Sequence, residues 1–178
     1  IIPSNILLSG AELEFNMLGR EYLLKNGIAP IRDNYDYIII DSPPSLSLLT
    51  VNGLIAARYV LLPVQAEFYA LEGLGQLLET MKLVRKGMNP SLELLGVLPT
   101  MLDSRTTLST QVHAEIKRHF PGKVFDTTIP RNIRLAEAPS HGIPIGVYDK
   151  FSKGSRAYKA LAKEVVARTE QALQGGGV

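Results

Sequence analysis

The stretch Tyr35-Asp36-Tyr37-Ile38-Ile39-Ile40-Asp41-Ser42-Pro43-Pro44-Ser45 indicates the fold class. Its segment 37–40 is apolar and rich in β-branched side chains, which is typical of a strand buried on both faces of a parallel sheet. Asp41 follows directly, at the end where a parallel sheet meets its ligand crevice. The two prolines remove two amide donors and favour an extended exit from the strand. An apolar strand followed by Asp is also an ordinary strand-to-turn cap. The residues alone therefore leave open whether Asp41 faces a ligand or only caps the turn.

Strand-like and helix-like segments alternate along the rest of the chain. The expected strands are 37–40, 60–64, 94–98 and 124–129, and Pro63 suggests the end of a strand or an irregularity in it. The expected helices are 11–25, 47–58, 71–86, 107–120 and 155–173. The segment 130–153 is a long, uneven stretch rich in Pro and Gly, and such loops are usually functional or poorly ordered. This alternation predicts an α/β three-layer sandwich with a mainly parallel sheet.

Topology and composition narrow the expected function. Ligands of such a sheet bind beyond the carboxyl ends of its strands, so the loops after Ile40, Val64, Leu98 and Ile129 should line the site. The 178 residues are 46% hydrophobic, which is enough for one well-buried domain. The absence of cysteine excludes disulfide scaffolds, thiolate metal sites and cysteine nucleophiles. Without a secretory signal or a bilayer-length apolar run, the expected location is the cytoplasm.

Charge is unevenly distributed along the chain. Residues 1–89 carry 7 basic and 9 acidic side chains (7 − 9 = −2), and residues 90–178 carry 12 and 8 (12 − 8 = +4). Within 117–163 the counts are 10 and 3, a local sum of +7. Such an excess marks either a surface for phosphate or nucleic acid or a solvated face whose charge is offset in space. Charge alone favours the solvated face.

The sequence resembles the ParA/Soj chromosome- and plasmid-partitioning ATPases, in the MinD-like branch with a deviant Walker A motif. Four blocks in collinear order carry the resemblance: YDYIIIDSPPS at 35–45, PVQAEFYALEGL at 63–74, MLDSRT at 101–106 and IPRNIRLAEAPSHGIP at 129–144. The resemblance implies a P-loop NTPase-like fold, with ATP and Mg²⁺ as cofactors. Relatives in the nitrogenase iron-protein branch are excluded, because their cluster needs cysteines.

Two family motifs are missing from this sequence. No glycine-rich loop of the form KGGxGKT occurs, and neither does the second acidic motif with its water-activating Asp. Both normally lie upstream of the point where this chain begins, and the chain begins with Ile1 rather than Met. The resemblance therefore implies that 1–173 is the carboxyl-terminal two-thirds of a single ParA-type ATPase domain, incomplete at its N-terminus, and that 174–178 is a flexible tail. The intact protein is expected to hydrolyse ATP with catalytic residues from upstream, and this chain alone is expected to be inactive.

The resemblance assigns roles to five residues. Asp41 matches the Walker B carboxylate that positions Mg²⁺ through water. Pro130 and Asn132 match the loop that approaches the adenine. Arg105 and Arg134 match positions through which related Soj proteins bind DNA without sequence preference, and guanidinium groups suit phosphate independently of the family.

Other segments keep two interpretations. The loop 42–47 resembles a switch that senses the γ-phosphate. The segment 67–73 resembles the border of a nucleotide-dependent dimer face, or is simply a helix N-terminus where Glu72 favours the dipole. Four further cations either extend the DNA surface or belong to a solvated helix face: Lys150, Lys153, Arg156 and Lys159. The three histidines suggest no metal site, and His113 and His119 are expected at the surface.

The leading hypothesis for the intact protein is a partition ATPase. ATP would hold two copies in a homodimer that binds DNA non-specifically, and a ParB-type centromere-binding protein would stimulate hydrolysis; the location would be cytoplasmic and nucleoid-associated. A MinD-like membrane-associated positioning ATPase is the first alternative, and it needs a terminal amphipathic helix. The apolar face of 155–173 has no Trp or Phe, so core packing explains it better and no stable membrane association is expected. The second alternative is an inactive fragment that retains only DNA or partner binding.

Overall fold

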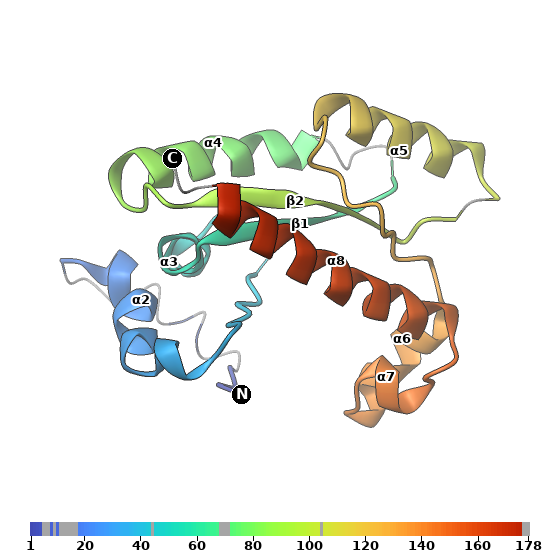
Figure 1. The fold of residues 1–178 in the computed structure, drawn as a ribbon, viewed down its shortest axis with the longest axis horizontal. Coiled ribbons are helices and arrows are strands. Elements are labelled where there is room, and N and C mark those ends of the chain that lie inside the picture. The colour runs from blue at the N-terminus through green and yellow to red at the C-terminus, as the bar shows by residue number, and fades with distance from the viewer. Residues whose placement is uncertain are drawn as a thin grey trace. The chain divides into compact units, whose positions relative to one another are not determined.

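The computed structural model describes residues 1–4, 8, 10, 18–43, 45–67, 72–103 and 105–175, with only the backbone at Glu72 and Gly73. It divides into two compact units: unit 1 comprises 1–60 and 75–93, and unit 2 comprises 61–74 and 94–178. Figure 1 draws the chain as a ribbon coloured by residue number. Residues 11–17 of the helix expected over 11–25 lie outside the described residues, as do the last three residues of the expected tail. The described part of 11–25 contains the 3₁₀-helix η1 (Arg20–Tyr22) and the start of α2 (Leu23–Ile28).

Unit 2 is built on a parallel sheet. Strands β1 (Tyr59–Gln65) and β2 (Glu93–Thr100) pair with each other, and the N–H of Ala66 donates to the carbonyl of Thr100 at 3.1 Å where both strands end. The other side of β2 carries an extended segment, joined by the parallel bridges Val97–Val124 and Leu102–Pro130. The expected strands at 60–64 and 94–98 are confirmed, whereas 124–129 makes isolated bridges instead of a regular strand. The α/β class with a parallel sheet is confirmed.

Pro63 does not end β1, because the strand continues to Gln65. Its side chain is exposed, and in the described part of the chain only one edge of β1 has a ladder partner. A proline is tolerated on such an edge strand, since its missing N–H is not needed for pairing there.

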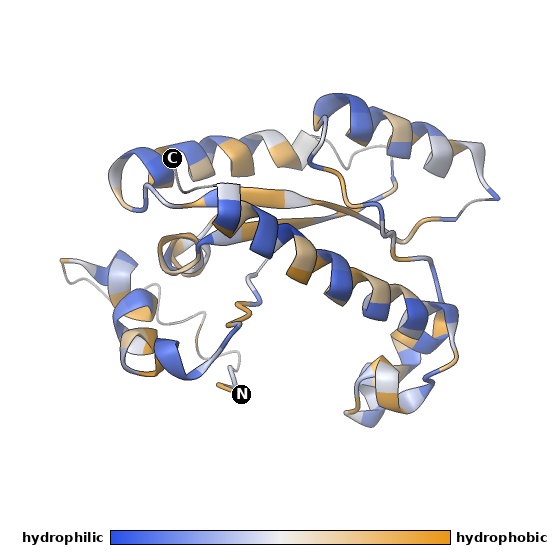
Figure 2. Cartoon of the chain, in the orientation of Figure 1, coloured by the Kyte–Doolittle hydropathy of each residue, from blue (hydrophilic) through white to orange (hydrophobic). Residues whose placement is uncertain are grey.

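Helix α8 (Lys153–Gly175) supplies most of the helical packing in the core of unit 2. Hydropathy alternates along it as an amphipathic helix requires (Figure 2). The core consists of Leu98, Phe125 and Ile129, with six partly buried residues packed against it: Leu61, Leu95, Leu135, Ala157, Leu161 and Val165. Three of these six belong to α8, so core packing accounts for its apolar face, as expected from the sequence.

Hydrogen bonds from a nearly buried ion pair within α8 hold this helix against the segment beside β2. Glu164 accepts the backbone N–H groups of Asp126 at 2.9 Å and Thr127 at 2.8 Å, and it pairs with Arg168 at 2.8 Å. Arg168 also donates to the carbonyl of Val124 at 2.6 Å, and its guanidinium lies 4.1 Å from the centre of the Phe125 ring. This clamp fixes the chain that leads to Pro130 and Asn132.

In its described residues, unit 2 also holds the helical elements α5 (Thr107–His119), α6 (Ile133–Glu137), η4 (Ala138–His141) and α7 (Ile145–Tyr148). Helix α5 matches the predicted 107–120, and the side chain of Thr106 caps it by accepting from Ser109 N at 3.4 Å. The long segment 130–153, expected as an uneven loop, is largely three short helices.

Unit 1 contains η1, α2, η2 (Ala29–Asn34), α3 (Leu48–Ala56) and most of α4 (Glu72–Gly87). Helices α3 and α4 confirm the predictions for 47–58 and 71–86. Two buried amides organise the unit. Asn52 accepts from Leu24 N and donates to the carbonyl of Arg20, each at 3.0 Å. Asn89 donates to the carbonyls of Leu54 at 2.9 Å and Ala57 at 2.6 Å, satisfying groups at the end of α3.

The strand predicted at 37–40 is wrong for this structure. Within the described residues the segment belongs to no strand, and the Ile39 side chain is 93% exposed. A strand buried on both faces would instead pair its N–H and C=O groups with a neighbouring strand on each side. The segment just after it approaches α3 closely: a Cβ on the buried Gly53 would lie 3.0 Å from Ser42 Oγ.

Candidate functional site

Charged side chains gather where the strands of unit 2 end. The residues after β2 stay paired with the residues that follow the extended segment beside β2. Leu102 N donates to Ile129 O at 3.1 Å, and Arg131 N donates to Leu102 O at 3.2 Å. Arg131 Nη2 in turn lies 3.5 Å from Glu67 Oε1, just after β1. Three of the four loops predicted to line the site are therefore together. The loop after Ile40 belongs to unit 1.

Arg105 makes a two-point contact with a carboxylate of its own turn. Its Nε donates to Asp103 Oδ1 at 2.9 Å and its Nη2 to Asp103 Oδ2 at 2.7 Å. The hydrogen bonds from Arg105 hold the pKa of Asp103 well below its usual range, so the pair stays ionised. The Arg105 side chain is 86% exposed, and a phosphate can reach it from solvent.

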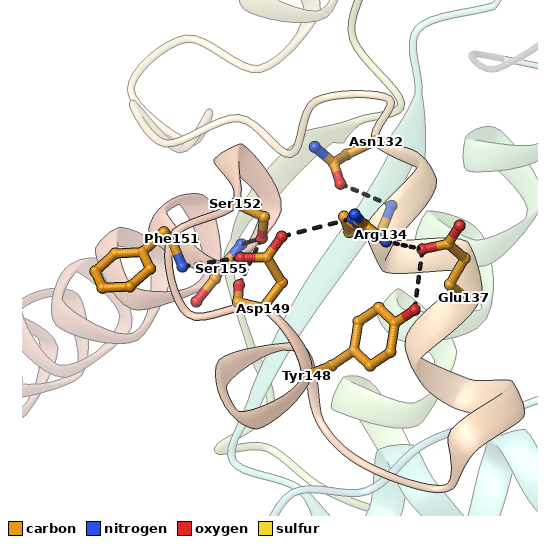
Figure 3. A network of polar contacts seen from close by, with 8 residues as sticks. All are labelled: Asn132, Arg134, Glu137, Tyr148, Asp149, Phe151, Ser152 and Ser155. Atoms are coloured by element: carbon orange, nitrogen blue, oxygen red, sulfur yellow. Dashed lines mark hydrogen bonds and ion pairs between the residues drawn. The ribbon is translucent and has the colours of Figure 1, made fainter.

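Arg134 lies at the centre of a polar network made by α6, α7 and the turn before α8 (Figure 3). Its Nη1 donates to Glu137 Oε2 at 2.9 Å, and its Nε lies 3.6 Å from Asp149 Oδ2. The Tyr148 hydroxyl donates to the same Glu137 oxygen at 3.1 Å. Hydrogen bonds from Arg134 and then Tyr148 lower the pKa of Glu137, and Glu137 in turn raises the pKa of Arg134.

The two residues expected near adenine follow the same edge of the sheet. Pro130 is half-buried and is held by its bridge to Leu102. Asn132 is the N-cap of α6, and its Oδ1 accepts the N–H of Arg134 at 3.0 Å. Its amide Nδ2 makes no hydrogen bond within the described part of the chain, so two N–H donors remain for the edge of a base.

Asp41 lies in unit 1 with an exposed side chain. Among the described residues it makes no hydrogen bond or ion pair, and no group of three or more His, Asp or Glu that could hold a metal forms there. A lone free carboxylate does not make an all-protein metal site. It does fit Mg²⁺ held mainly by phosphate oxygens and water, which is how this ion is usually bound with nucleotides.

The remaining predicted segments are only partly described. In the loop 42–47, Ser47 Oγ is buried without a hydrogen-bond partner in the described structure, and Pro44 lies outside the described residues. Most of 67–73 lies outside them or is described by backbone alone. His113, expected at the surface, is half-buried, and its burial beside Lys117 lowers its pKa.

The solvent face of α8 carries a basic stripe that the sequence identified in part. Lys153, Arg156 and Lys159 were expected there, and the structure adds Lys163 by its i,i+4 spacing from Lys159. All four are exposed, and none of their side chains makes an ion pair or hydrogen bond with other described residues. Arg156, Lys159 and Lys163 lie on the side of the helix opposite the core-packing Ala157, Leu161 and Val165, and Lys153 lies in the first turn at the edge of that side. Lys150 lies instead over the Phe151 ring, 5.0 Å from its centre.

Sequence reasoning missed the partners of Arg134. Glu137 stands three residues further on, and that spacing on a helix is a recognisable pairing signal. Tyr148 and Asp149 come from a separate segment and had no such signal. None of the helices in the described ranges is at once long and apolar enough to cross a bilayer.

Comparison with known proteins gives consistent matches. A family model described as an AAA domain matches residues 1–94. The sporulation initiation inhibitor protein Soj of Bacillus subtilis (strain 168) is 55% identical over 168 residues, covering 94% of this chain and 66% of that protein. The chromosome-partitioning ATPase Soj of Treponema pallidum (strain Nichols) is 50% identical over 171 residues, covering 96% of this chain and 68% of that protein.

Among solved structures, cobyrinic acid a,c-diamide synthase from Mycobacterium smegmatis with bound ADP and magnesium matches with a TM-score of 0.78 at 39% identity. That match covers 94% of this chain and 62% of the other. The chain thus spans about two thirds of the length of these relatives. Its fold is that of P-loop NTPase-like α/β proteins.

Proposed function

The chain belongs to the Soj/ParA family of chromosome-partitioning ATPases, and from that premise we propose that it works in DNA segregation as an ATP-dependent, non-specific DNA binder. In this proposal the complete protein hydrolyses ATP, forms a homodimer with ATP and Mg²⁺, and is stimulated by a ParB-type centromere-binding protein. It would act in the cytoplasm, on the nucleoid.

The basic stripe of α8 is the observation that carries the DNA-binding part. Its four cations, Lys153, Arg156, Lys159 and Lys163, extend over about 15 Å of helix at 1.5 Å per residue. Duplex DNA of that length presents roughly nine phosphate charges. Cations without acidic partners can face those charges with nothing to displace but counterions. Backbone contacts of this kind carry no sequence information, as non-specific binding requires.

The nucleotide part rests on residues whose side chains are available. Asp41 offers a free carboxylate, and Asn132 offers amide donors from a turn that its own Oδ1 fixes. Pro130 adds an apolar ring beside Asn132 on the same loop. The bound triphosphate and Mg²⁺ would supply the charge that differs between ATP and ADP states. Only such differential contacts can shift a conformational equilibrium.

The DNA-binding part is tested by the salt dependence of affinity. The protein from its complete reading frame, with ATP and Mg²⁺, is titrated against two fluorescent duplexes of unrelated sequence at several salt concentrations. Lys159→Gln/Lys163→Gln should weaken binding to both duplexes equally and reduce the slope of log K against log salt by about 2. The matched control is Lys82→Gln/Lys86→Gln, which removes the same charge from α4 and should leave the slope unchanged.

The outcome decides between a DNA surface and an ordinary solvated face. Equal slopes for the α8 variant and the wild-type protein would reject α8 as the DNA surface. A difference between the two duplexes in the wild-type protein would reject non-specific recognition. Circular dichroism of each variant confirms that the helices are intact.

A further inference from the structure

We infer that Glu137 and Asp149 are internal competitors for Arg134, so that they weaken the contact of its guanidinium with a DNA phosphate. This inference rests on the proposed DNA binding and specifies how that binding is regulated. The carboxylates keep the contact weak and reversible, and they couple it to the turn between α7 and α8.

Two carboxylates already lie against the Arg134 guanidinium. Arg134 Nη1 donates to Glu137 Oε2 at 2.9 Å, and Asp149 Oδ2 forms an ion pair with Nε at 3.6 Å, which is too long for a hydrogen bond. Figure 3 shows the guanidinium between the two carboxylates. A phosphate that approaches Arg134 therefore competes with both carboxylates for the same positive charge.

The local charge also opposes DNA. Arg134 contributes +1, whereas Glu137 and Asp149 contribute −2, so the cluster carries −1 near neutral pH. The lowered pKa of Glu137 keeps that carboxylate ionised. By contrast, the cations of the α8 stripe have no acidic partner within the described chain. DNA therefore meets unpaired cations on α8, whereas two carboxylates surround the positive charge of Arg134.

The competing groups come from separate segments, which distinguishes Arg134 from Arg105. The carboxylate on Arg105 belongs to its own turn, so releasing it changes little else. Glu137 lies on α6 and also receives the Tyr148 hydroxyl of α7, while Asp149 accepts Phe151 N at 3.1 Å in the turn before α8. A phosphate that displaces Asp149 from Arg134 therefore removes one link between α6 and the segment 148–152.

The pairs are partly exposed, with side chains of Arg134, Glu137 and Asp149 at 53%, 38% and 31%. Ion pairs of this exposure are individually weak, so DNA can displace them. Removing one competitor should raise DNA affinity about two- to fivefold. A loss of negative charge alone would also raise affinity, so the experiment must separate the two effects.

The experiment is a double-mutant cycle on the complete protein with ATP and Mg²⁺. Glu137→Gln and Asp149→Asn are each measured for DNA affinity, alone and combined with Arg134→Gln. Glu170→Gln on α8 is the control for charge, since it removes an exposed carboxylate that makes no recorded contact with Arg134. Hydrogen exchange of the segment 148–152, with and without DNA, reports the coupled turn.

We expect a two- to fivefold gain for each competitor variant, no gain when Arg134 is already Gln, and faster exchange in 148–152 once wild-type protein binds DNA. A gain that persists in the Arg134→Gln background, or that Glu170→Gln reproduces, would overturn the inference. So would reduced affinity of both Glu137→Gln and Asp149→Asn with unchanged circular dichroism. Wild-type protein that binds no DNA at any salt would instead reject the proposed function itself.

Discussion

Replacing Glu164 with Gln should loosen the attachment of α8 to the segment beside β2. The carboxylate takes two backbone N–H groups, from Asp126 and Thr127, and pairs with Arg168. A Gln of the same shape keeps one acceptor oxygen but presents an NH₂ group where the second N–H points. It also leaves the guanidinium of Arg168 without its anion.

The size of the effect follows from burial. The side chains of Arg168 and Glu164 are only 20% and 16% exposed, so solvent screens the pair weakly. Losing a charge-assisted hydrogen bond costs about 1.5–3 kcal/mol, and removing one partner of a fully buried ion pair costs about 3–5 kcal/mol. For this nearly buried pair we expect unfolding to become easier by about 2–4 kcal/mol. In urea the midpoint should fall by about 1–2 M.

Urea denaturation followed by circular dichroism at pH 7 measures this loss. The matched control is Glu170→Gln, an exposed position on the same helix, which should change the free energy of unfolding by no more than about 0.5 kcal/mol. Amide exchange at Asp126 and Thr127 locates the effect and should accelerate only in Glu164→Gln. Equal midpoints for both variants, with unchanged exchange, would refute the clamp.

The same variant has a pH signature. Burial by itself would raise the pKa of Glu164, but the hydrogen bonds from Thr127, Asp126 and Arg168 outweigh it and hold the pKa below its ordinary value of 4.5. A carboxylate with a lowered folded-state pKa stabilises the fold above its unfolded pKa, and that contribution is lost as pH falls through the folded pKa. The difference in stability between wild type and Glu164→Gln should therefore be full at pH 7 and shrink below pH 4.5.

Two further substitutions, one of them with a matched control, test the packing of the units. Gly96→Ala should destabilise unit 2 by at least about 2 kcal/mol in thermal melts, because its Cβ would lie 2.5 Å from the backbone oxygen of Lys123 and 2.8 Å from Phe125. Its control is Gly75→Ala, which has nothing within 4 Å of the new Cβ and should be neutral or stabilising by about 0.5–1 kcal/mol. Asn89→Ala should cost about 2–3 kcal/mol in urea unfolding, because two carbonyls at the end of α3 lose their buried donor, and an unchanged midpoint would contradict that role.

The sequence predicted the regular elements whose own periodicity decides them. Strand β2 is a continuous apolar run with paired backbone on both sides, and α4, α5 and α8 bury one helical face each. The run 37–40 is also apolar, yet an apolar composition alone cannot supply the neighbouring strands with which such a segment pairs. Short helices such as α6 were also missed, because one cap at Asn132 and five residues leave too little periodicity.

The sequence indicated where the candidate residues lie along the chain but not which side chains contact one another. Pro130, Asn132 and Arg134 follow the extended segment beside β2, and Arg105 follows β2. The structure adds that both arginines are already engaged by carboxylates. Asp149 comes from a turn 15 positions beyond Arg134, and only the folded chain shows that the two meet. The roles of Asp41, Pro130 and Asn132 in nucleotide binding stay predictions.

Retention of DNA by the complete protein with ATP and Mg²⁺, compared with ADP, tests the partition-ATPase assignment most directly. We predict tight, salt-sensitive, sequence-independent binding with ATP only, abolished by Arg134→Glu while nucleotide binding is spared. Equal DNA binding in both nucleotide states, or full binding by Arg134→Glu at low salt, would contradict it.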